Sequence, residues 1–204
     1  MPTFQPKLNL VVEGETDRVV LTELLHSRDF TEIEPYVKGG KGELLKRLDS
    51  YNQAARYSPW LVVLDLDRDA ACAPDYLKRI LPQPKSNMIL RIAVHSIETW
   101  LMADQEMMAR FLSIPVREFP ASPDRVTFPK RFLVNLVQQK CPPKLRRSLV
   151  EEMTGNRDLS GPGYRYWINR FAARHWRPEV AAQRSDSLAR CIRALKDLKR
   201  QSAR

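Results

Sequence analysis

Two stretches of the sequence carry most of the information about the fold: LNLVVEGETD at residues 8–17 and WLVVLDLD at residues 60–67. Each begins as an apolar run and ends in acidic residues. A short apolar run without polar alternation is typical of a strand that is buried on both faces, as in a parallel sheet. The two stretches therefore predict strands at Leu8–Val12 and Trp60–Leu66, each with carboxylates at its carboxyl end.

The rest of the first half alternates between strand and helix patterns. The strand patterns are completed by Ile33–Val37 and Met88–Val94, and the helical ones are Thr16–Ser27, Glu43–Ala55, Pro74–Leu81 and Ser96–Met102. Strands that alternate with helices are typical of a parallel sheet with helices packed on it. We therefore expect an α/β fold with a parallel sheet flanked by helices.

The second half has a different character. Residues 113–163 hold seven of the fifteen prolines, which predicts loops with short helices at Arg131–Gln139 and Lys144–Met153. Beyond them, the helical spacing of apolar side chains predicts one helix from Tyr164 and a last one from about Ser187. The aromatic side chains of the first of these are expected in the core. We divide the chain into a metal-binding domain, residues 1–110, and a basic, helical, proline-rich extension, residues 111–204.

Charge is distributed unevenly between the halves. The net charge is +10 over 204 residues, but residues 1–104 carry −2 and residues 105–204 carry +12. A basic half can hold phosphates while an acidic one holds metal, so this pattern favours DNA or RNA as a partner. An ordinary arginine-rich surface is the alternative. The three cysteines lie far apart, and the sequence has neither a membrane-length apolar run nor a signal peptide pattern, so we expect a soluble cytoplasmic protein with no membrane partner.

Three acidic motifs follow predicted strands. They contribute Glu13, the pair Asp65 and Asp67, and Glu98. In a parallel sheet the carboxyl ends of the strands share one edge, so these side chains should gather there. Asp65 and Asp67, two apart in an extended segment, should face the same way and bind one hard cation, Mg²⁺ or Mn²⁺.

Other acidic residues near these motifs have ordinary structural explanations. Asp69 is interpreted as a turn residue or helix cap. Glu15 and Asp17 lie in the first turn of a predicted helix, where acidic side chains favour the positive end of the dipole. Glu98 admits the same explanation as an alternative to metal binding.

The order and spacing of these motifs resemble those of the Toprim domain. The segment VVEGETD at residues 11–17 and LDLD at residues 64–67 are similar to its two motifs, and HSIETWLMAD at residues 95–104 resembles the third motif of a small stand-alone Toprim-like bacterial family related to the OLD nucleases. The resemblance implies a Toprim-like sheet in which Glu13 is the general acid or base and also a metal ligand, and in which Asp65 and Asp67 are catalytic metal ligands. Glu98 would match an additional ligand.

The function that this resemblance implies is a nuclease or phosphodiesterase in antiphage defence. No ATPase motif is present in the chain, so a chain that works as OLD nucleases do would need a separate ATPase subunit. The alternative is a non-catalytic Toprim-like subunit that binds an ATPase or nucleic acid. The sequence does not decide whether the substrate is DNA or RNA, nor what the oligomeric state is.

Basic residues supply the candidate nucleic-acid surface. Lys41 lies in the glycine loop KGGKG at residues 38–42, which either approaches a phosphate or is a simple turn. The candidates in the second half are Arg170, Arg174 and Arg177, which share an arc of one predicted helix, and Arg190 and Arg193 on the last helix. Each face could equally be solvated surface.

Overall fold

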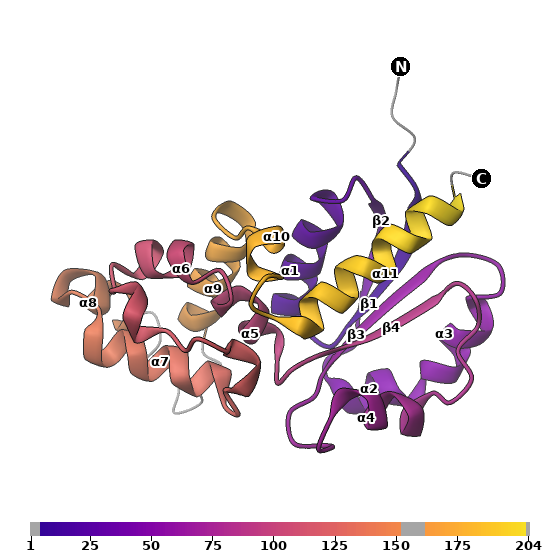
Figure 1. The fold of residues 1–204 in the computed structure, drawn as a ribbon, viewed down its shortest axis with the longest axis horizontal. Coiled ribbons are helices and arrows are strands. Elements are labelled where there is room, and N and C mark those ends of the chain that lie inside the picture. The colour runs from indigo at the N-terminus through magenta and orange to yellow at the C-terminus, as the bar shows by residue number, and fades with distance from the viewer. Residues whose placement is uncertain (1–4, 152–161, 203–204) are drawn as a thin grey trace.

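The computed structural model describes residues 5–151 and 162–202, and these form an α/β fold (Figure 1). The strands in this part of the chain make one parallel sheet in the order β2-β1-β3-β4. They are β1 (Lys7–Val12), β2 (Thr31–Val37), β3 (Trp60–Asp65) and β4 (Met88–Ala93). All four agree with the predicted strands, so the predicted α/β class with a parallel sheet is confirmed.

Helices cover both faces of the sheet. Their bounds are α1 (Glu15–His26), α2 (Lys41–Lys46), α3 (Leu48–Ala54), α4 (Ala73–Ile80), α5 (Ile97–Met102), α6 (Gln105–Leu112), α7 (Pro129–Lys140), α8 (Pro143–Glu151), α9 (Pro162–Arg174), α10 (Pro178–Ala181) and α11 (Asp186–Ser202). Two short 3₁₀ turns, Val116–Glu118 and Pro123–Arg125, lie between α6 and α7. The second half is thus helical and loop-rich, as its prolines predict.

The sheet separates two apolar clusters because successive side chains of a strand point to opposite faces. On β3, Leu61 and Val63 join the cluster that contains α1 and α11, whereas Val62 and Leu64 join the cluster formed with α2, α3 and α4. Figure 1 shows these two groups of helices on opposite sides of the strands. Both faces of the central strands are therefore buried, which explains their continuous apolar sequence.

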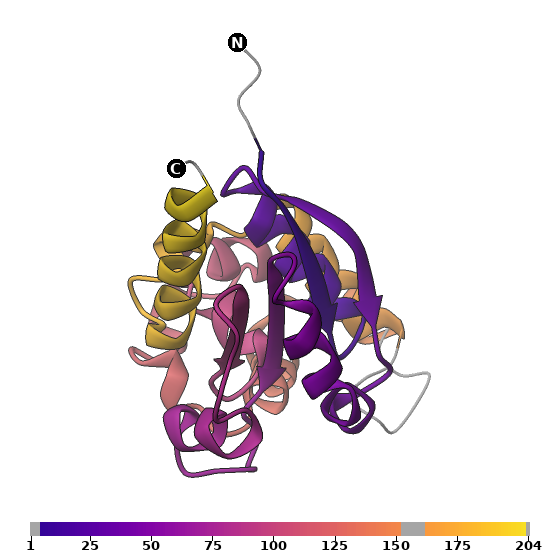
Figure 2. The ribbon, with the colours of Figure 1, turned by 90° about the vertical axis from the view of Figure 1, so that its right-hand side faces the viewer.

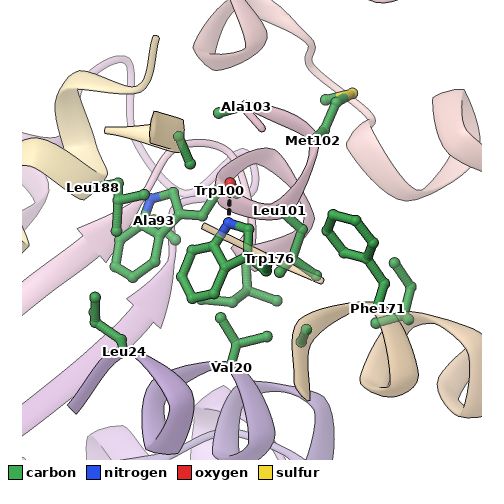
Figure 3. Packing of buried hydrophobic residues seen from close by; sticks show 14 of the residues in the cluster. Val20, Leu24, Ala93, Trp100, Leu101, Met102, Ala103, Phe171, Trp176 and Leu188 are labelled. Carbon is green, nitrogen blue, oxygen red and sulfur yellow. Dashed lines mark hydrogen bonds between the residues drawn. The ribbon is translucent and has the colours of Figure 1, made fainter. Parts of the chain in front are cut away.

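The C-terminal helices share the larger cluster with the sheet. Trp100 of α5 and Trp176, just after α9, lie against Val20 and Leu24 of α1 (Figure 3). Both indole N–H groups are satisfied: Trp176 Nε1 donates to the Trp100 carbonyl at 3.1 Å, and Trp100 Nε1 donates to Ser187 Oγ at 2.8 Å. Helix α11 runs beside β4 (Figures 1 and 2). One continuous core therefore joins the sheet to the basic helices.

Several helix predictions need correction or limits. The predicted helix Glu43–Ala55 is two helices, because the backbone leaves helical geometry at Arg47, where φ is −108° and ψ is 1°. Helix α6 was absent from the predicted elements, although Met107, Met108 and Phe111 have helical spacing. The predicted end of α8 at Met153 lies outside the described residues. The predicted core aromatics Tyr164, Trp167 and Phe171 are confirmed as buried.

Candidate functional site

The first strand delivers two acidic side chains to the carboxyl edge of the sheet. Glu13 directly follows β1, and its Oε1 accepts a hydrogen bond from the Asp65 backbone N–H at 2.9 Å, which ties the ends of β1 and β3 together. Asp17 lies in the first turn of α1 and accepts the Gly14 N–H through Oδ2 at 2.9 Å. Asp17 thus lies in the first helical turn, as predicted, and its carboxylate is also close enough to Asp65 and Glu98 for their charges to interact.

Asp65 and Glu98 connect β3 with the start of α5. Asp65 Oδ1 accepts the backbone N–H of Ile97 at 2.9 Å. Glu98 is 8% exposed, and both of its oxygens accept hydrogen bonds from neutral groups: Ser96 Oγ at 2.6 Å and the Tyr164 hydroxyl at 3.2 Å. The site therefore includes Ser96 and Tyr164. Neither of them is given a role in the site by the sequence patterns: Ser96 is only part of the motif HSIETWLMAD, and Tyr164 is predicted as a core residue.

Asp67 does not project beside Asp65 as the extended-strand argument predicts. Strand β3 ends at Asp65, and Asp67 has a left-handed backbone with φ of 48°. The turn is held by the Asp67 N–H, which donates to the His95 carbonyl at 2.8 Å. The two-residue alternation is lost once the strand ends, so the Asp67 side chain is exposed and takes other partners.

Lys41 is one of those partners, so it does not point freely toward a phosphate as predicted from the sequence. Its Nζ donates to Asp67 Oδ2 at 2.5 Å and to Asp69 Oδ2 at 2.8 Å. Burial disfavours the charged amine, but the hydrogen bonds to Asp67 and Asp69 raise the pKa of Lys41 overall. The glycine loop is equally engaged, since the Gly40 N–H donates to the Glu13 carbonyl at 2.9 Å. The predicted phosphate contact of Lys41 would therefore require it to leave two carboxylates.

The acidic side chains at this edge repel one another. Burial, followed by the negative charges of Asp17, Glu98 and Glu13, raises the pKa of Asp65 well above its ordinary value. Burial and the charges of Glu13 and Glu98 raise the pKa of Asp17 to about 7. Burial also raises the pKa of Glu13, although the Asp65 N–H and Lys41 oppose the rise. Carboxylates this crowded are costly to keep ionised together.

The acidic side chains at this edge are candidate ligands for a metal ion. In the described part of the chain, no three His, Cys, Asp or Glu side chains are already arranged to hold a metal ion. The donor chemistry nevertheless fits Mg²⁺ or Mn²⁺, since such ions need only one or two carboxylates beside water and substrate oxygens. Within residues 5–151 and 162–202, Glu13 Oε2 and Asp65 Oδ2 accept no hydrogen bond. These two oxygens are the best candidates for ligands.

A cleft of about 430 Å³ opens beside the acids. One wall consists of Asp65, Asp67, His95, Ser96 and Glu98, from the segments that follow β3 and β4 and from the start of α5. The other wall is the segment Thr127–Arg131, which leads into α7. The cleft thus lies where the sheet meets the helical half, and both halves supply its side chains.

The predicted basic residues of the second half divide into three groups. Arg170 and Arg174 are exposed on α9, as the arc predicts. Arg177 is not part of that arc, because α9 ends at Arg174, and its guanidinium instead donates to Asp104 at 2.6 and 3.0 Å. Arg190 pairs with Asp186 at 2.6 Å, and Arg193 lines a separate hollow of about 300 Å³ with Arg91.

Comparison with models of protein families, with curated proteins and with solved structures finds no match to this chain. Nor does any helix in the described ranges have the length and apolar character needed to cross a membrane. The functional argument therefore depends on the site itself.

Proposed function

We infer that this protein is a Toprim-like, metal-dependent phosphodiesterase acting on nucleic acid, with Mg²⁺ or Mn²⁺ at the carboxyl edge of its sheet. The observation that carries this inference is the crowding of Glu13, Asp17 and Glu98 around Asp65, which raises the pKa of Asp65. Strongly perturbed acids in a cleft are typical of functional sites, since repulsion of this kind adds nothing to stability. The order of the acidic motifs along parallel strands supports the Toprim-like form of the proposal.

The residues have distinct roles in this proposal. Asp65 and Glu13 would hold the ion through the oxygens that accept no hydrogen bond, and a divalent ion bound there would polarise a phosphate and lower the pKa of a water ligand. Glu13 also transfers the proton, for which its raised pKa brings it closer to neutral pH. Lys41 balances Asp67 and Asp69 at the mouth of the site. The basic second half binds the phosphate backbone.

Two observations favour a second candidate function. Lys41 forms an ion pair with Asp67, and within the described residues no three His, Cys, Asp or Glu side chains are arranged to hold a metal ion. Both features suit a non-catalytic subunit that binds nucleic acid or a separate ATPase. In that case the acids would bind metal weakly or not at all.

The test measures metal binding and cleavage with the same variants. Titration calorimetry with Mn²⁺ compares the wild type with the double variant Glu13→Gln, Asp65→Asn, and supercoiled plasmid and labelled RNA are incubated with each protein. We expect the double variant to lose both Mn²⁺ binding and cleavage. The matched control is Asp49→Asn, Asp75→Asn, which removes two exposed aspartates of α3 and α4. Equal Mn²⁺ affinity in wild type and double variant would eliminate the metal site, and metal binding without cleavage would favour the non-catalytic subunit.

A further inference from the structure

The cleft has a second wall that none of the predicted nucleic-acid contacts includes. Phe128, Lys130 and Arg131 lie in the segment Thr127–Arg131, across the cleft from Asp65 and Glu98. The segment carries two positive charges and no negative one. The Lys130 ammonium already lies 4.9 Å from the centre of the Tyr164 ring, whereas Arg131 is exposed, so Arg131 is the cation of this segment that a phosphodiester near the acids would meet.

Phe128 is unusual because the fold does not require it. Its side chain is 50% exposed and belongs to neither apolar cluster. It occupies the N-cap of α7, where it makes no capping hydrogen bond, although Ser, Thr, Asp or Asn would be preferred there. A large aromatic side chain at a capping position in a cleft needs an explanation other than helix stability.

The surroundings of the ring suit a flat, electron-rich ligand. The Arg68 guanidinium lies 5.3 Å from the centre of the Phe128 ring. Arg68 comes from the same turn as Asp67, so this pair bridges the acidic wall and the α7 wall. Nucleic-acid bases stack on aromatic rings and on guanidinium planes, and stacking is available only to bases that are not already paired within a duplex.

We propose that this cleft binds an unpaired nucleotide, with its base stacked on Phe128 and its phosphate between Arg131 and the acids. The substrate would then be single-stranded DNA or RNA, or an unpaired end or loop. This inference rests on the proposed phosphodiesterase function for the location of the phosphate, whereas the base contact depends on Phe128 alone. Stacking tolerates all four bases, so little sequence preference is expected.

The test measures binding separately from cleavage. Fluorescence anisotropy follows a labelled 12-nucleotide single strand, as DNA and as RNA, and a blunt 12-base-pair DNA duplex, with Ca²⁺ in place of Mn²⁺. The single strands should bind at least about tenfold tighter than the duplex, and Phe128→Ser should weaken single-strand binding by about 5- to 100-fold without changing duplex binding. The difference between the DNA and RNA arms identifies the natural substrate.

Two further variants show whether the loss of binding is due to the loss of a stacking ring at position 128. Phe128→Trp retains a stacking ring and should bind within about threefold of wild type. Tyr57→Ser removes another exposed aromatic, next to the amino end of β3, and should have no effect. The inference is overturned if single strand and duplex bind equally, if neither binds, or if Phe128→Ser binds single strands as wild type does. If single strands bind in a way that depends on Phe128 but no strand is cleaved, only the proposal of catalysis is contradicted.

Discussion

In the described part of the chain, the buried Asp104 and the acidic side chains at the carboxyl edge of the sheet are balanced in opposite ways. Asp104 has no exposed surface, and Arg177 donates three hydrogen bonds to it, from its backbone N–H at 2.9 Å, Nε at 3.0 Å and Nη2 at 2.6 Å. At the carboxyl edge, by contrast, Glu13, Asp17, Asp65 and Glu98 form no ion pair with any Lys or Arg in the described ranges.

We interpret Asp104 as a structural charge and the carboxyl-edge acids as the charges of the proposed site. A buried carboxylate that only holds helices together is paired, because an unpaired one costs several kcal/mol. The Asp104 pair links the start of α6 to the segment before α10, which is 73 residues away. The carboxyl-edge acids instead retain their repulsion, which a bound cation would relieve. The following predictions test this distinction.

The largest effect is expected at Glu13. Glu13→Gln keeps an oxygen to accept the Asp65 N–H but cannot transfer a proton, so cleavage should fall by at least about 100-fold. Folding and nucleic-acid affinity should stay close to wild type. Glu15→Gln is the matched control, since Glu15 is exposed and pairs only with Arg18 at 2.7 Å. Equal cleavage by wild type and Glu13→Gln would show that the catalytic residue has been assigned wrongly.

Removing the cation that pairs with Asp104 should lower the stability of the protein rather than its activity. Arg177→Ala leaves Asp104 buried without its cation, and we expect the free energy of unfolding to fall by about 2–3 kcal/mol. Urea denaturation measures this loss. Arg190→Ala breaks an exposed pair with Asp186 and should cost less than about 1 kcal/mol. A similar loss in both variants would mean that the Asp104 pair is no more important than a surface contact.

The unpaired acids should make stability depend on pH. Since burial and neighbouring charges raise the pKa of Asp17 from 3.8 to about 7, the folded chain holds a proton that the unfolded chain releases. This contribution to stability is present below about pH 4 and is lost as the pH rises toward about 7. Asp17→Asn should therefore stabilise the metal-free protein at pH 8 by about 1–2 kcal/mol, and by much less near pH 4.

Thermal unfolding at the two pH values checks this prediction. Asparagine at position 17 still offers an oxygen to the Gly14 N–H, so the helix cap is retained. Asp49→Asn, on the exposed surface of α3, should show no comparable pH dependence. Destabilisation of Asp17→Asn at pH 8 would indicate that the ionised carboxylate is stabilised after all.

The smallest effect concerns the exposed arginines. Because Arg170 and Arg174 are exposed whereas Arg177 is bound to Asp104, only the first two should contact phosphates freely. The double variant Arg170→Ala, Arg174→Ala should flatten the slope of log affinity against log salt by about 0.7–0.9 per lost contact. Lys46→Ala, Arg56→Ala removes two exposed cations from α2 and the end of α3 and should leave the slope unchanged. The opposite result would place the binding surface on that face.

Sequence patterns were sufficient for the parts of this protein that depend on local physics. The apolar runs identify β1, β3 and β4, because burial on both faces leaves no polar alternation, whereas β2 is a partly exposed edge strand with the sequence TEIEPYV. The acidic residues at the strand ends follow from topology, since parallel strands end at one edge. The core position of Tyr164, Trp167 and Phe171 follows from helical spacing.

The remaining features depend on contacts between residues far apart in the chain. The left-handed turn at Asp67 removes it from the face of Asp65, and Lys41, 26 residues away, takes its carboxylate. Arg177 meets Asp104 across 73 residues. Strand and helix periodicity describes only which side a residue faces within one element. Which charge meets which partner, and therefore which acids remain unpaired, is set by how the elements pack together.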